Sequence, residues 1–360
     1  MAAALCAARG SGAHAASVAI VERAPALGGI LNQCTHKGFG LTYFGEELTG
    51  IDYARRFARL VDTADIDVFT DTSAIDIGGD RTVAVSGATA GLLRLQAKAV
   101  ILATGCRERP IGALPVAGTR PSGVFTAGSA QKMMNIGGYD IGNRFVILGS
   151  GDVGMIVARH LAQSGKEVIA VLEISQDCGG LPSNRINCLE RYNIPLLTRT
   201  TVSKVHGAGR VCGVTVADLA QGGSRFIECD TLITSVGLVP ERDLLDGLLS
   251  EGPLPDWLFL CGNACFVHDT ADDTTFESER TGSLAADFAL HGVRMPGANH
   301  GDRARSDSFS PAEALAHGGT AGLSESGEVV CCACPKSCRA VLTSGGWQGL
   351  CCGRDSPDIG

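Results

Sequence analysis

Six residues near the middle of the chain have the composition and spacing of a phosphate-binding turn. They read G-S-G-D-V-G from Gly149 to Gly154, after the apolar segment 144–148 and before the segment 155–163, whose apolar residues recur at helical spacing. In a G-x-G-x-x-G turn the first glycine permits the tight turn, the second lets a pyrophosphate approach the backbone, and the third lets helix and strand pack closely. The amino end of the helix then offers free N–H groups and a positive dipole end to the phosphates.

An acidic residue completes this pattern. Residues 166–173 are predicted to form the next strand, which ends at Glu173, 24 residues after Gly149 (173 − 149). A carboxylate at this position accepts hydrogen bonds from the adenosine ribose. Residues 174–176 contain no cation for a 2′-phosphate, which favours NAD over NADP. The alternative is a glycine-rich turn with a purely structural role. The predicted nucleotide contacts are Gly149, Gly151, Asp152, Gly154, Glu173 and Gly237.

The amino-terminal segment contains only the second half of such a unit. Residues 17–22 are predicted to form a strand that ends at Glu22, and the alanine-rich residues 1–9 suit the helix before it. The first strand and its glycine turn, which should precede that helix, are absent from the sequence. That strand is central in a parallel sheet, and its loss leaves buried backbone groups of both neighbours without partners. We therefore expect either that the true start lies upstream or that the chain is a damaged copy.

Composition limits the classes of function. The net charge of −8 and the aromatic content of 5% oppose binding to nucleic acid or to an anionic membrane. No apolar run approaches the length of a membrane span. The 15 cysteines, without a clear export signal, indicate thiols or metal ligands in a reducing cytoplasm. The sequence has none of the G-x-S-x-G, H-E-x-x-H or G-x4-G-K-[ST] motifs of hydrolases and phosphate-binding loops.

The cysteines near the carboxyl terminus have metal-ligand spacing. They read C-C-A-C-P-K-S-C over residues 331–338, with a further pair at 351–352. Thiolates two residues apart can hold one metal from a tight turn, and four complete a tetrahedral site or a cluster. The spacing leaves zinc and an iron–sulfur cluster open, and reduced cysteines in an unstructured tail are the third interpretation.

The order of these motifs resembles the pyridine nucleotide–disulfide oxidoreductase fold, a family of flavoproteins with two dinucleotide-binding domains. The marks, in chain order, are E-R at 22–23, G-G at 28–29, A-T-G at 103–105, the glycine turn at 149–154 and C-G-N at 261–263. Further segments are similar to one branch, the FAD-dependent oxidoreductases associated with anaerobic-type glycerol-3-phosphate dehydrogenases. Relatives of that branch are flavoprotein subunits of dye-linked proline dehydrogenase, opine oxidase and hydrogen cyanide synthase. The segments are 28–36, 38–40, 103–109, 139–142 and 188–190, and the likeness covers about residues 1–295.

The resemblance implies an α/β fold with two Rossmann-like FAD/NAD(P)-binding domains, the second inserted in the first, and a small Cys-rich C-terminal module. We expect an FAD-binding domain over 1–105 and 256–293 and an NAD-binding domain over 106–255. A flexible linker over 294–328 then leads to a four-cysteine metal-binding module over 329–360. A helix is predicted over 282–291.

The resemblance also implies roles for individual residues. Glu22, next to Arg23, holds the FAD ribose, and Gly28 and Gly29 let the chain pass close to FAD. The segment Ala103, Thr104, Gly105 marks the crossing into the NAD domain, and Gly262 with Asn263 contacts the ribityl chain. Two departures weaken the expected FAD affinity: the first glycine turn is missing, and the segment 240–257 is shortened. The implied metal ligands are Cys331, Cys334, Cys338 and Cys352, with Cys351 as a substitute.

Disulfide reductases of this fold carry two cysteines just after the double glycine. Here Cys34 stands alone, with Leu31 and His36 at the two redox positions, so we expect no disulfide relay. Cys34 and His36 are weak catalytic candidates, against the alternatives of a packing cysteine and of a surface or hydrogen-bonded histidine. His268, beside Asp269, is a third weak candidate, with helix capping as the alternative.

These observations predict an FAD-dependent oxidoreductase subunit that passes electrons between FAD, NAD and the tail centre. It would work in the cytoplasm, at a membrane only through a partner, and with a partner dehydrogenase subunit. The sequence does not identify the small-molecule substrate. The alternatives are a truncated or non-catalytic NAD-binding scaffold and, for the tail, a zinc-stabilised docking module.

Overall fold

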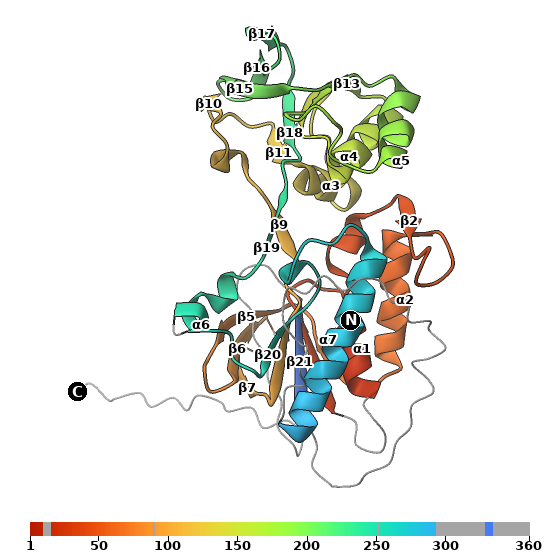
Figure 1. Ribbon diagram of the computed structural model, residues 1–360, viewed down its shortest axis with the longest axis vertical. Helices are drawn as coiled ribbons and strands as arrows, with labels where there is room; N and C mark the ends of the chain where they lie inside the picture. Colours follow the sequence, from red (N-terminus) through yellow and green to blue (C-terminus); the bar gives the residue numbers. More distant parts are fainter. Residues whose placement is uncertain (10–15, 89–90, 251, 293–327, 334–360) are drawn as a thin grey trace, which may run out of the picture. The chain divides into compact units, whose positions relative to one another are not determined.

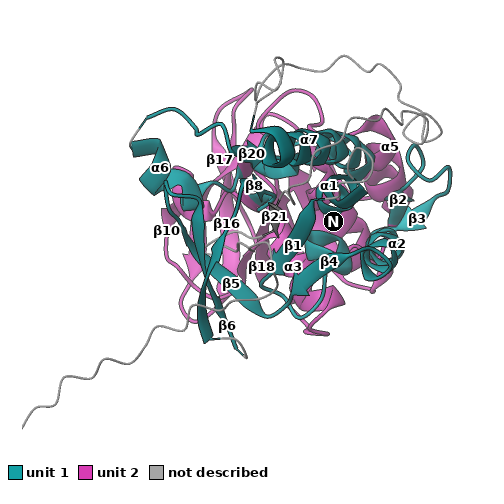
Figure 2. Ribbon diagram, turned by 90° about the horizontal axis from the view of Figure 1, so that it is seen from below, with its two compact units in different colours: residues 1–32, 37–106, 240–360 teal, residues 33–36, 107–239 magenta. Residues whose placement is uncertain are grey.

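The chain divides into two compact units (Figure 1, Figure 2). The computed structural model describes residues 1–9, 16–88, 91–250, 252–292 and 328–333. Unit 1 is built from residues 1–32, 37–106 and 240–360, and unit 2 from residues 33–36 and 107–239. Both have Rossmann-like α/β architecture, and unit 2 is inserted in the sequence of unit 1, as the fold-class prediction states.

A five-stranded parallel sheet is the framework of unit 1. Its strand order is β20-β8-β21-β1-β4. The strands are β1 (Ser17–Glu22), β4 (Ile66–Phe69), β8 (Ala99–Leu102), β20 (Leu258–Leu260) and β21 (Glu328–Ala333). An antiparallel meander adds β5 (Thr72–Ile77), β6 (Thr82–Gly87) and β7 (Gly91–Gln96), and a short hairpin adds β2 (Lys37–Phe39) and β3 (Leu48–Thr49). The helices are α1 (Ala2–Arg9), α2 (Gly50–Asp62), α6 (Asp246–Ser250) and α7 (Ala271–His291).

The central strand of this sheet comes from the carboxyl-terminal part of the chain. Strand β21 lies between β1 and β8 and is parallel to both, so that Val330 is opposite Ala19 on one side and Val100 on the other. The sequence analysis assigned residue 328 to the linker and residues 329–333 to a separate metal-binding module. Their backbone instead belongs to the sheet, because two buried parallel strands both need a hydrogen-bonding neighbour there. The rest of the predicted linker and module lies outside the described residues.

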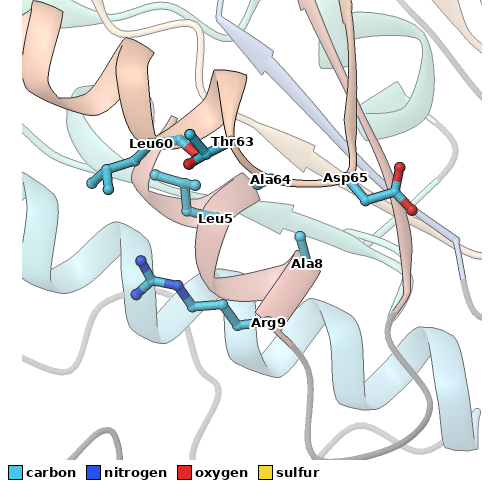
Figure 3. A pocket seen from close by; sticks show the side chains of 7 residues that line it. All are labelled: Leu5, Ala8, Arg9, Leu60, Thr63, Ala64 and Asp65. Atoms are coloured by element: carbon cyan, nitrogen blue, oxygen red, sulfur yellow. The ribbon is translucent and has the colours of Figure 1, made fainter.

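Helices α1 and α7 approach each other closely. A Cβ atom on Gly282 of α7 would lie 2.1 Å from the backbone oxygen of Ala3 in α1, so only glycine permits this contact. On its other side, α1 borders a cavity of about 310 Å³ together with Leu60 and the turn before β4 (Figure 3). That turn precedes the amino end of β4, which places the cavity away from the carboxyl ends of the parallel strands.

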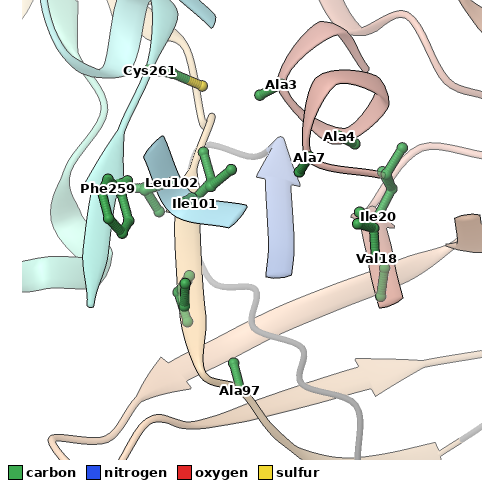
Figure 4. Close-up of a cluster of buried hydrophobic side chains, with 14 of the residues drawn as sticks. Ala3, Ala4, Ala7, Val18, Ile20, Ala97, Ile101, Leu102, Phe259 and Cys261 are labelled. Atoms are coloured by element: carbon green, nitrogen blue, oxygen red, sulfur yellow. The ribbon is translucent and has the colours of Figure 1, made fainter. Parts of the chain in front are cut away.

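The core of unit 1 is formed by short apolar strands that are buried on both faces. All four residues of β8 and all three of β20 are buried, as is most of β1. Figure 4 shows the small side chains of α1, among them Ala3, Ala4 and Ala7, at the same core. The meander contributes Val83 and Val85. Continuous apolar runs of this kind are typical of parallel strands covered on both faces.

Helix α7 is longer than the sequence predicted, because it begins at Ala271 and not near Gly282. Thr270 caps it by accepting a hydrogen bond from the amide of Asp273 at 3.1 Å. The first turns bury polar residues, including Asp272, Thr275 and Ser278. The apolar periodicity that reveals a helix in a sequence is therefore missing from its first half.

Unit 2 contains a second five-stranded parallel sheet, in the order β11-β18-β12-β13-β14. Its strands are β11 (Val124–Thr126), β12 (Arg144–Leu148), β13 (Glu167–Leu172), β14 (Leu196–Leu197) and β18 (Thr231–Thr234). The helices are α3 (Ala127–Asn135), α4 (Asp152–Gln163) and the short α5 (Pro182–Asn184). A second sheet consists of β10 (Ala117–Gly118), β15 (Thr200–Gly207), β16 (Val211–Asp218) and β17 (Ser224–Ile227). Strands β9 (Cys106–Glu108) and β19 (Leu238–Pro240) pair where the chain passes between the units. Within the described parts of both units, no helix is long and apolar enough to cross a membrane.

The pairing of β21 predicts the effect of a proline at Val330. Because β21 has a neighbour on each side, proline removes a ladder N–H and leaves a buried carbonyl without its donor, at a cost of about 1–3 kcal/mol. We expect Val330→Pro to speed hydrogen–deuterium exchange in β1 and β8, measured by mass spectrometry, while β12 and β13 keep their protection. Val330→Ala retains the amide and is the matched control. Unchanged exchange in β1 and β8 of the proline variant would contradict this placement of β21.

Candidate functional site

The residues expected to contact FAD gather at one edge of the unit 1 sheet. All five strands of that sheet are parallel, so their carboxyl ends lie at the same edge. Glu22 ends β1, residues 103–105 follow β8, and Gly262 and Asn263 follow β20 shortly after Cys261. Ligands of open α/β sheets bind beyond the carboxyl ends of the strands.

Glu22 is buried at this edge, with 4% of its surface exposed. Burial raises the pKa of its carboxyl group, and the hydrogen bond that its Oε1 accepts from the Ala24 amide at 2.9 Å opposes the rise. The segment that follows contains Gly28 and Gly29, both with positive φ. A Cβ on Gly29 would meet no protein atom within 4 Å, so the space beside this glycine is open.

The turn after β8 is held by the segment that returns from unit 2. The hydroxyl of Thr104 donates to the Glu241 backbone oxygen at 2.5 Å, and the Glu241 amide donates to the oxygen of Gly105 at 2.9 Å. Gly105 has φ +74°, and a Cβ there would meet no protein atom within 4 Å. The backbone of this turn is thus fixed from one side and open on the other.

The turn after β20 is held by residues that the sequence analysis did not identify. The carboxylate of Glu277 in α7 accepts from the Gly262 amide at 2.6 Å and from the Thr281 hydroxyl at 3.0 Å. Burial raises the pKa of Glu277, against the effect of these bonds. Asn263 accepts from the His268 amide at 3.0 Å, and its own amide group lies 3.6 Å from the sulfur of Cys106.

His268 contacts the turn through its ring as well. Its Nδ1 lies 3.3 Å from the Asn263 side-chain oxygen, and the ring stacks on Phe266 with centroids 4.0 Å apart. Nε2 is buried without a hydrogen-bond partner among the described residues. Burial lowers the pKa of this histidine. The helix cap expected as the alternative role falls to Thr270 instead.

Asp272 was also missed by the sequence analysis. Its two carboxylate oxygens accept from the backbone amides of Gly40, Thr42 and Tyr43 at 2.8–3.2 Å, which fixes the loop before β3 onto the start of α7. The T-x-x-D pattern from Thr270 to Asp273 could have shown the start of the helix that carries Asp272, although no apolar run follows this pattern.

Cys34 and His36 belong to unit 2, where Cys34 lies against α3 and His36 lies near Arg159 and His160 of α4. Burial raises the pKa of the Cys34 thiol to about 11, and its sulfur lies 3.8 Å from the Gln131 side-chain oxygen. A protonated thiol is a poor nucleophile, so the geometry favours the packing role. The pKa of His36 is lowered to about 4 by burial and by the nearby Arg159 and His160, so its ring is neutral at neutral pH.

The glycine turn of unit 2 connects β12 to α4 and has two kinds of glycine. A Cβ on Gly149 would lie 2.0 Å from the Ser235 backbone oxygen, and one on Gly154 would lie 2.7 Å from the Ser235 Cβ. A Cβ on Gly151 would come no closer than 3.4 Å to any protein atom outside its chain neighbours. Close packing within the protein therefore accounts for Gly149 and Gly154, whereas Gly151 leaves room for a ligand.

Glu173 is bound to the same turn. Its Oε2 accepts from the Ser150 amide at 3.0 Å and the Ser150 hydroxyl at 2.6 Å, while Oε1 accepts from the Ser175 amide at 2.9 Å. Burial raises the pKa of Glu173, but these hydrogen bonds outweigh it and lower the pKa overall. Gly237, the last residue of the predicted set, accepts a hydrogen bond from the Arg109 amide through its backbone oxygen at 3.0 Å.

Residues 174–176 contain no cationic side chain, but folding places Arg199 beside them. The guanidinium of Arg199 hydrogen-bonds to the Gln176 side chain, and the Arg199 amide donates to the Ser175 backbone oxygen at 3.0 Å. No motif marks Arg199, since it follows a different strand and reaches the site only through folding.

Of the predicted metal ligands, only Cys331 lies among the described residues. Its backbone is inside β21, opposite Ile20 and Ile101. Cys334, Cys338, Cys351 and Cys352 lie outside the described residues. Within the part of the chain that the structure describes, no group of three or more His, Cys, Asp or Glu residues could hold a metal ion.

A known protein family matches most of this chain. The sequence profile of the family described as "Pyridine nucleotide-disulphide oxidoreductase" matches residues 1–252. The alpha subunit of sarcosine oxidase from Corynebacterium sp. (strain U-96) is 27% identical over 66% of this chain and 25% of its own length. An opine oxidase subunit of Rhizobium meliloti is 33% identical over 35% of this chain and 25% of its own length. The chain thus spans about a quarter of the length of these relatives.

Solved structures show the same fold. Thioredoxin reductase of T. acidophilum superimposes with a TM-score of 0.60 and 21% identity, over 79% of this chain and 92% of that chain.

The low pKa of His36 predicts acid sensitivity. An unfolded histidine titrates near pH 6.5, whereas folded His36 titrates near about 4, so between these values only the unfolded state binds the proton. The stability contribution is present above pH 6.5 and is lost as the pH falls toward 4, a change on the order of 1–3 kcal/mol. We expect His36→Gln to lose less of its free energy of unfolding than the wild type between about pH 7 and about pH 5, as measured by urea unfolding. His291→Gln, at an exposed position, is the control, and equal acid sensitivity of wild type and His36→Gln would contradict the prediction.

Proposed function

Because the chain belongs to the pyridine nucleotide-disulphide oxidoreductase family, we propose that it is an FAD-dependent oxidoreductase that exchanges electrons with NAD(H). The observation that carries the proposal is the open backbone at both nucleotide edges. Gly29 and Gly105 in unit 1, and Gly151 in unit 2, lack side chains at positions where the protein itself does not need the space. Gly29 and Gly105 have positive φ, which itself favours glycine. Gly151 has φ −62°, so at this position the close approach of a pyrophosphate to the backbone is the remaining reason for glycine.

In unit 1 the residues that would hold FAD are Glu22, Arg23, the two glycine positions 28–29 and the turns 103–105 and 262–263. When bound, FAD supplies the electron-transfer chemistry, while the protein supplies binding, orientation and electrostatics. Glu22 would accept from the adenosine ribose hydroxyls. Glu277 would hold the Gly262 turn in one conformation, so that the backbone is preorganised before the cofactor arrives.

In unit 2 the dinucleotide would lie on the amino end of α4, where Asp152 and Val153 present their amides. Glu173 stays ionised and buried beside the turn, and its charge opposes a 2′-phosphate, so we propose NAD over NADP. Arg199 instead favours NADP, since a guanidinium is the usual partner of a 2′-phosphate. A comparison of NADH with NADPH as reductant decides between the two.

The two relatives described above, from sarcosine oxidase and opine oxidase, are subunits of oxidases by name. This supports our proposal that the chain works with a partner dehydrogenase subunit. We also propose that the chain belongs to the branch associated with glycerol-3-phosphate dehydrogenases, because several of its sequence segments resemble that branch. In this proposal the partner subunit oxidises the substrate. Nine of the described cysteines, from Cys6 to Cys265, are free thiols, which supports our proposal of a reducing, cytoplasmic setting.

For the tail we propose a metal centre, with an iron–sulfur cluster favoured by the redox setting. Because Cys331 is within β21, such a centre would begin at the carboxyl end of the central strand of unit 1. Analysis of iron, sulfide and zinc in anaerobically purified protein separates a cluster from a zinc module, and the absence of all three would contradict a metal centre.

The proposed activity predicts an absorption spectrum. Anaerobically purified protein should show flavin bands, and these should bleach when NADH is added. A colourless preparation that takes up no FAD would contradict the proposal and favour an NAD-binding scaffold without catalytic activity.

The open space at Gly151 predicts a selective loss of nicotinamide binding. Alanine at 151 meets no protein atom closer than 3.4 Å, but its methyl group would intrude on the pyrophosphate. We expect Gly151→Ala to keep its melting temperature and to lose about 1–3 kcal/mol of NADH affinity, or roughly 5- to 150-fold, in flavin-reduction titrations. Gly209→Ala, in an exposed turn of unit 2 with ordinary φ and no atom within 4 Å, is the matched control. Equal NADH affinities of the two variants would contradict this site.

A further inference from the structure

The segment 178–184, here called the covering segment, lies against the glycine turn of unit 2. The Gly179 amide donates to the Ser150 hydroxyl at 2.7 Å. The Leu181 amide and the Asn184 side-chain amide both donate to Oδ1 of Asp152, at 2.8 and 2.7 Å. The covering segment is thus attached at two points to the turn that it follows in the chain.

These bonds place the backbone of the covering segment over the phosphate-binding end of α4. A Cβ atom on Gly180 would lie 2.9 Å from the Asp152 amide nitrogen and 2.5 Å from Oδ1 of Asp152. A Cβ on Gly179 would lie 3.8 Å from the Gly151 amide nitrogen. A pyrophosphate bound to these amides needs the same volume. The backbone of the covering segment therefore runs beside the volume that a dinucleotide in the proposed position would need.

The electrostatics favour the same interpretation. The amides of Asp152 and Val153 donate no hydrogen bond within the part of the chain that the structure describes. The carboxylate of Asp152 stands in the first turn of α4, where it compensates the positive end of the helix dipole. An arriving pyrophosphate would bring its own negative charge to the same end of the helix, so Asp152 stabilises the covered state and opposes the bound state.

We infer that Asp152 is a positioning residue that latches the covering segment over the dinucleotide site, so that NADH binds only after this latch opens. The inference rests on the proposed use of NAD(H) by unit 2. Its energetic consequence is a lowered apparent affinity, because only the open fraction of the protein is competent to bind. Weakening the latch should therefore tighten binding.

The experiment uses the full chain and two readouts. Cys178 lies in the covering segment, with its sulfur 3.7 Å from the Ser150 backbone oxygen and 3.6 Å from the sulfur of Met155, so opening exposes it. Its alkylation rate, resolved by peptide mass spectrometry, reports opening without any nucleotide. Cys212 is exposed on β16 and serves as the internal reference thiol. NADH affinity is measured by protein-to-nucleotide fluorescence transfer, which does not depend on flavin.

We expect Asp152→Ala to raise the alkylation rate of Cys178 about tenfold relative to Cys212 and to tighten NADH binding by a similar factor. Saturating NADH should raise the same rate in the wild type. Asp152→Asn keeps an oxygen acceptor for Leu181 and Asn184 but loses the charge, so its Cys178 rate should lie between those of the wild type and Asp152→Ala.

Two results would overturn the latch specifically. One is an unchanged Cys178 rate in Asp152→Ala; the other is a raised rate with unchanged or weaker NADH binding. A third result would separate the latch from the proposed function: the Cys178 rate responds to Asp152→Ala, but neither wild type nor variant binds NADH. The proposed use of NAD(H) would then be wrong, and so would the gating role. The contact between Asp152 and the covering segment would still be supported.

Discussion

The structure of unit 1 depends on the pairing of the strand between β1 and β8. Both neighbours are buried parallel strands, and each presents backbone groups that water cannot reach. Strand β21 satisfies both at once and continues the parallel order of the sheet. The edge at which the candidate FAD residues gather exists only while this order holds, because Glu22 and the turn at 103–105 end the two strands that β21 joins.

Buried and half-buried carboxylates hold the loops of the candidate sites around that framework. Asp272 and Glu277 of α7 accept backbone amides from the loop before β3 and from the Gly262 turn. Glu173 does the same for the glycine turn of unit 2. A carboxylate that accepts several backbone amides fixes a loop in one conformation and balances its own burial. Asp152 uses the same chemistry for a different result, since the amides that it binds belong to a segment that covers the site.

Glycines in the two units separate into those required by packing and those open to a ligand. Gly149 and Gly154 would clash with Ser235 if they carried a side chain, and Gly282 would clash with Ala3. Gly29, Gly105 and Gly151 would not clash with the protein, but Gly29 and Gly105 have positive φ, which itself favours glycine. The pattern G-x-G-x-x-G therefore combines two physical requirements, and only the middle glycine reports directly on the nucleotide.

The resemblance to a known family implied the insertion of one dinucleotide unit in the other. The sequence by itself determined the α/β class and the positions of Glu22, Gly151 and Glu173 after predicted strands. These follow from local patterns: apolar runs for buried strands, glycine spacing for the turn, and an acid at the end of the next strand. Tertiary structure decided everything that depends on distant segments. The start of α7 escaped prediction because its buried residues are polar, and Glu277, Asp272 and Arg199 act through contacts that no local pattern records. Likewise, only folding shows that residues 328–333 are the central strand of unit 1, since an apolar run does not state which strands it will join.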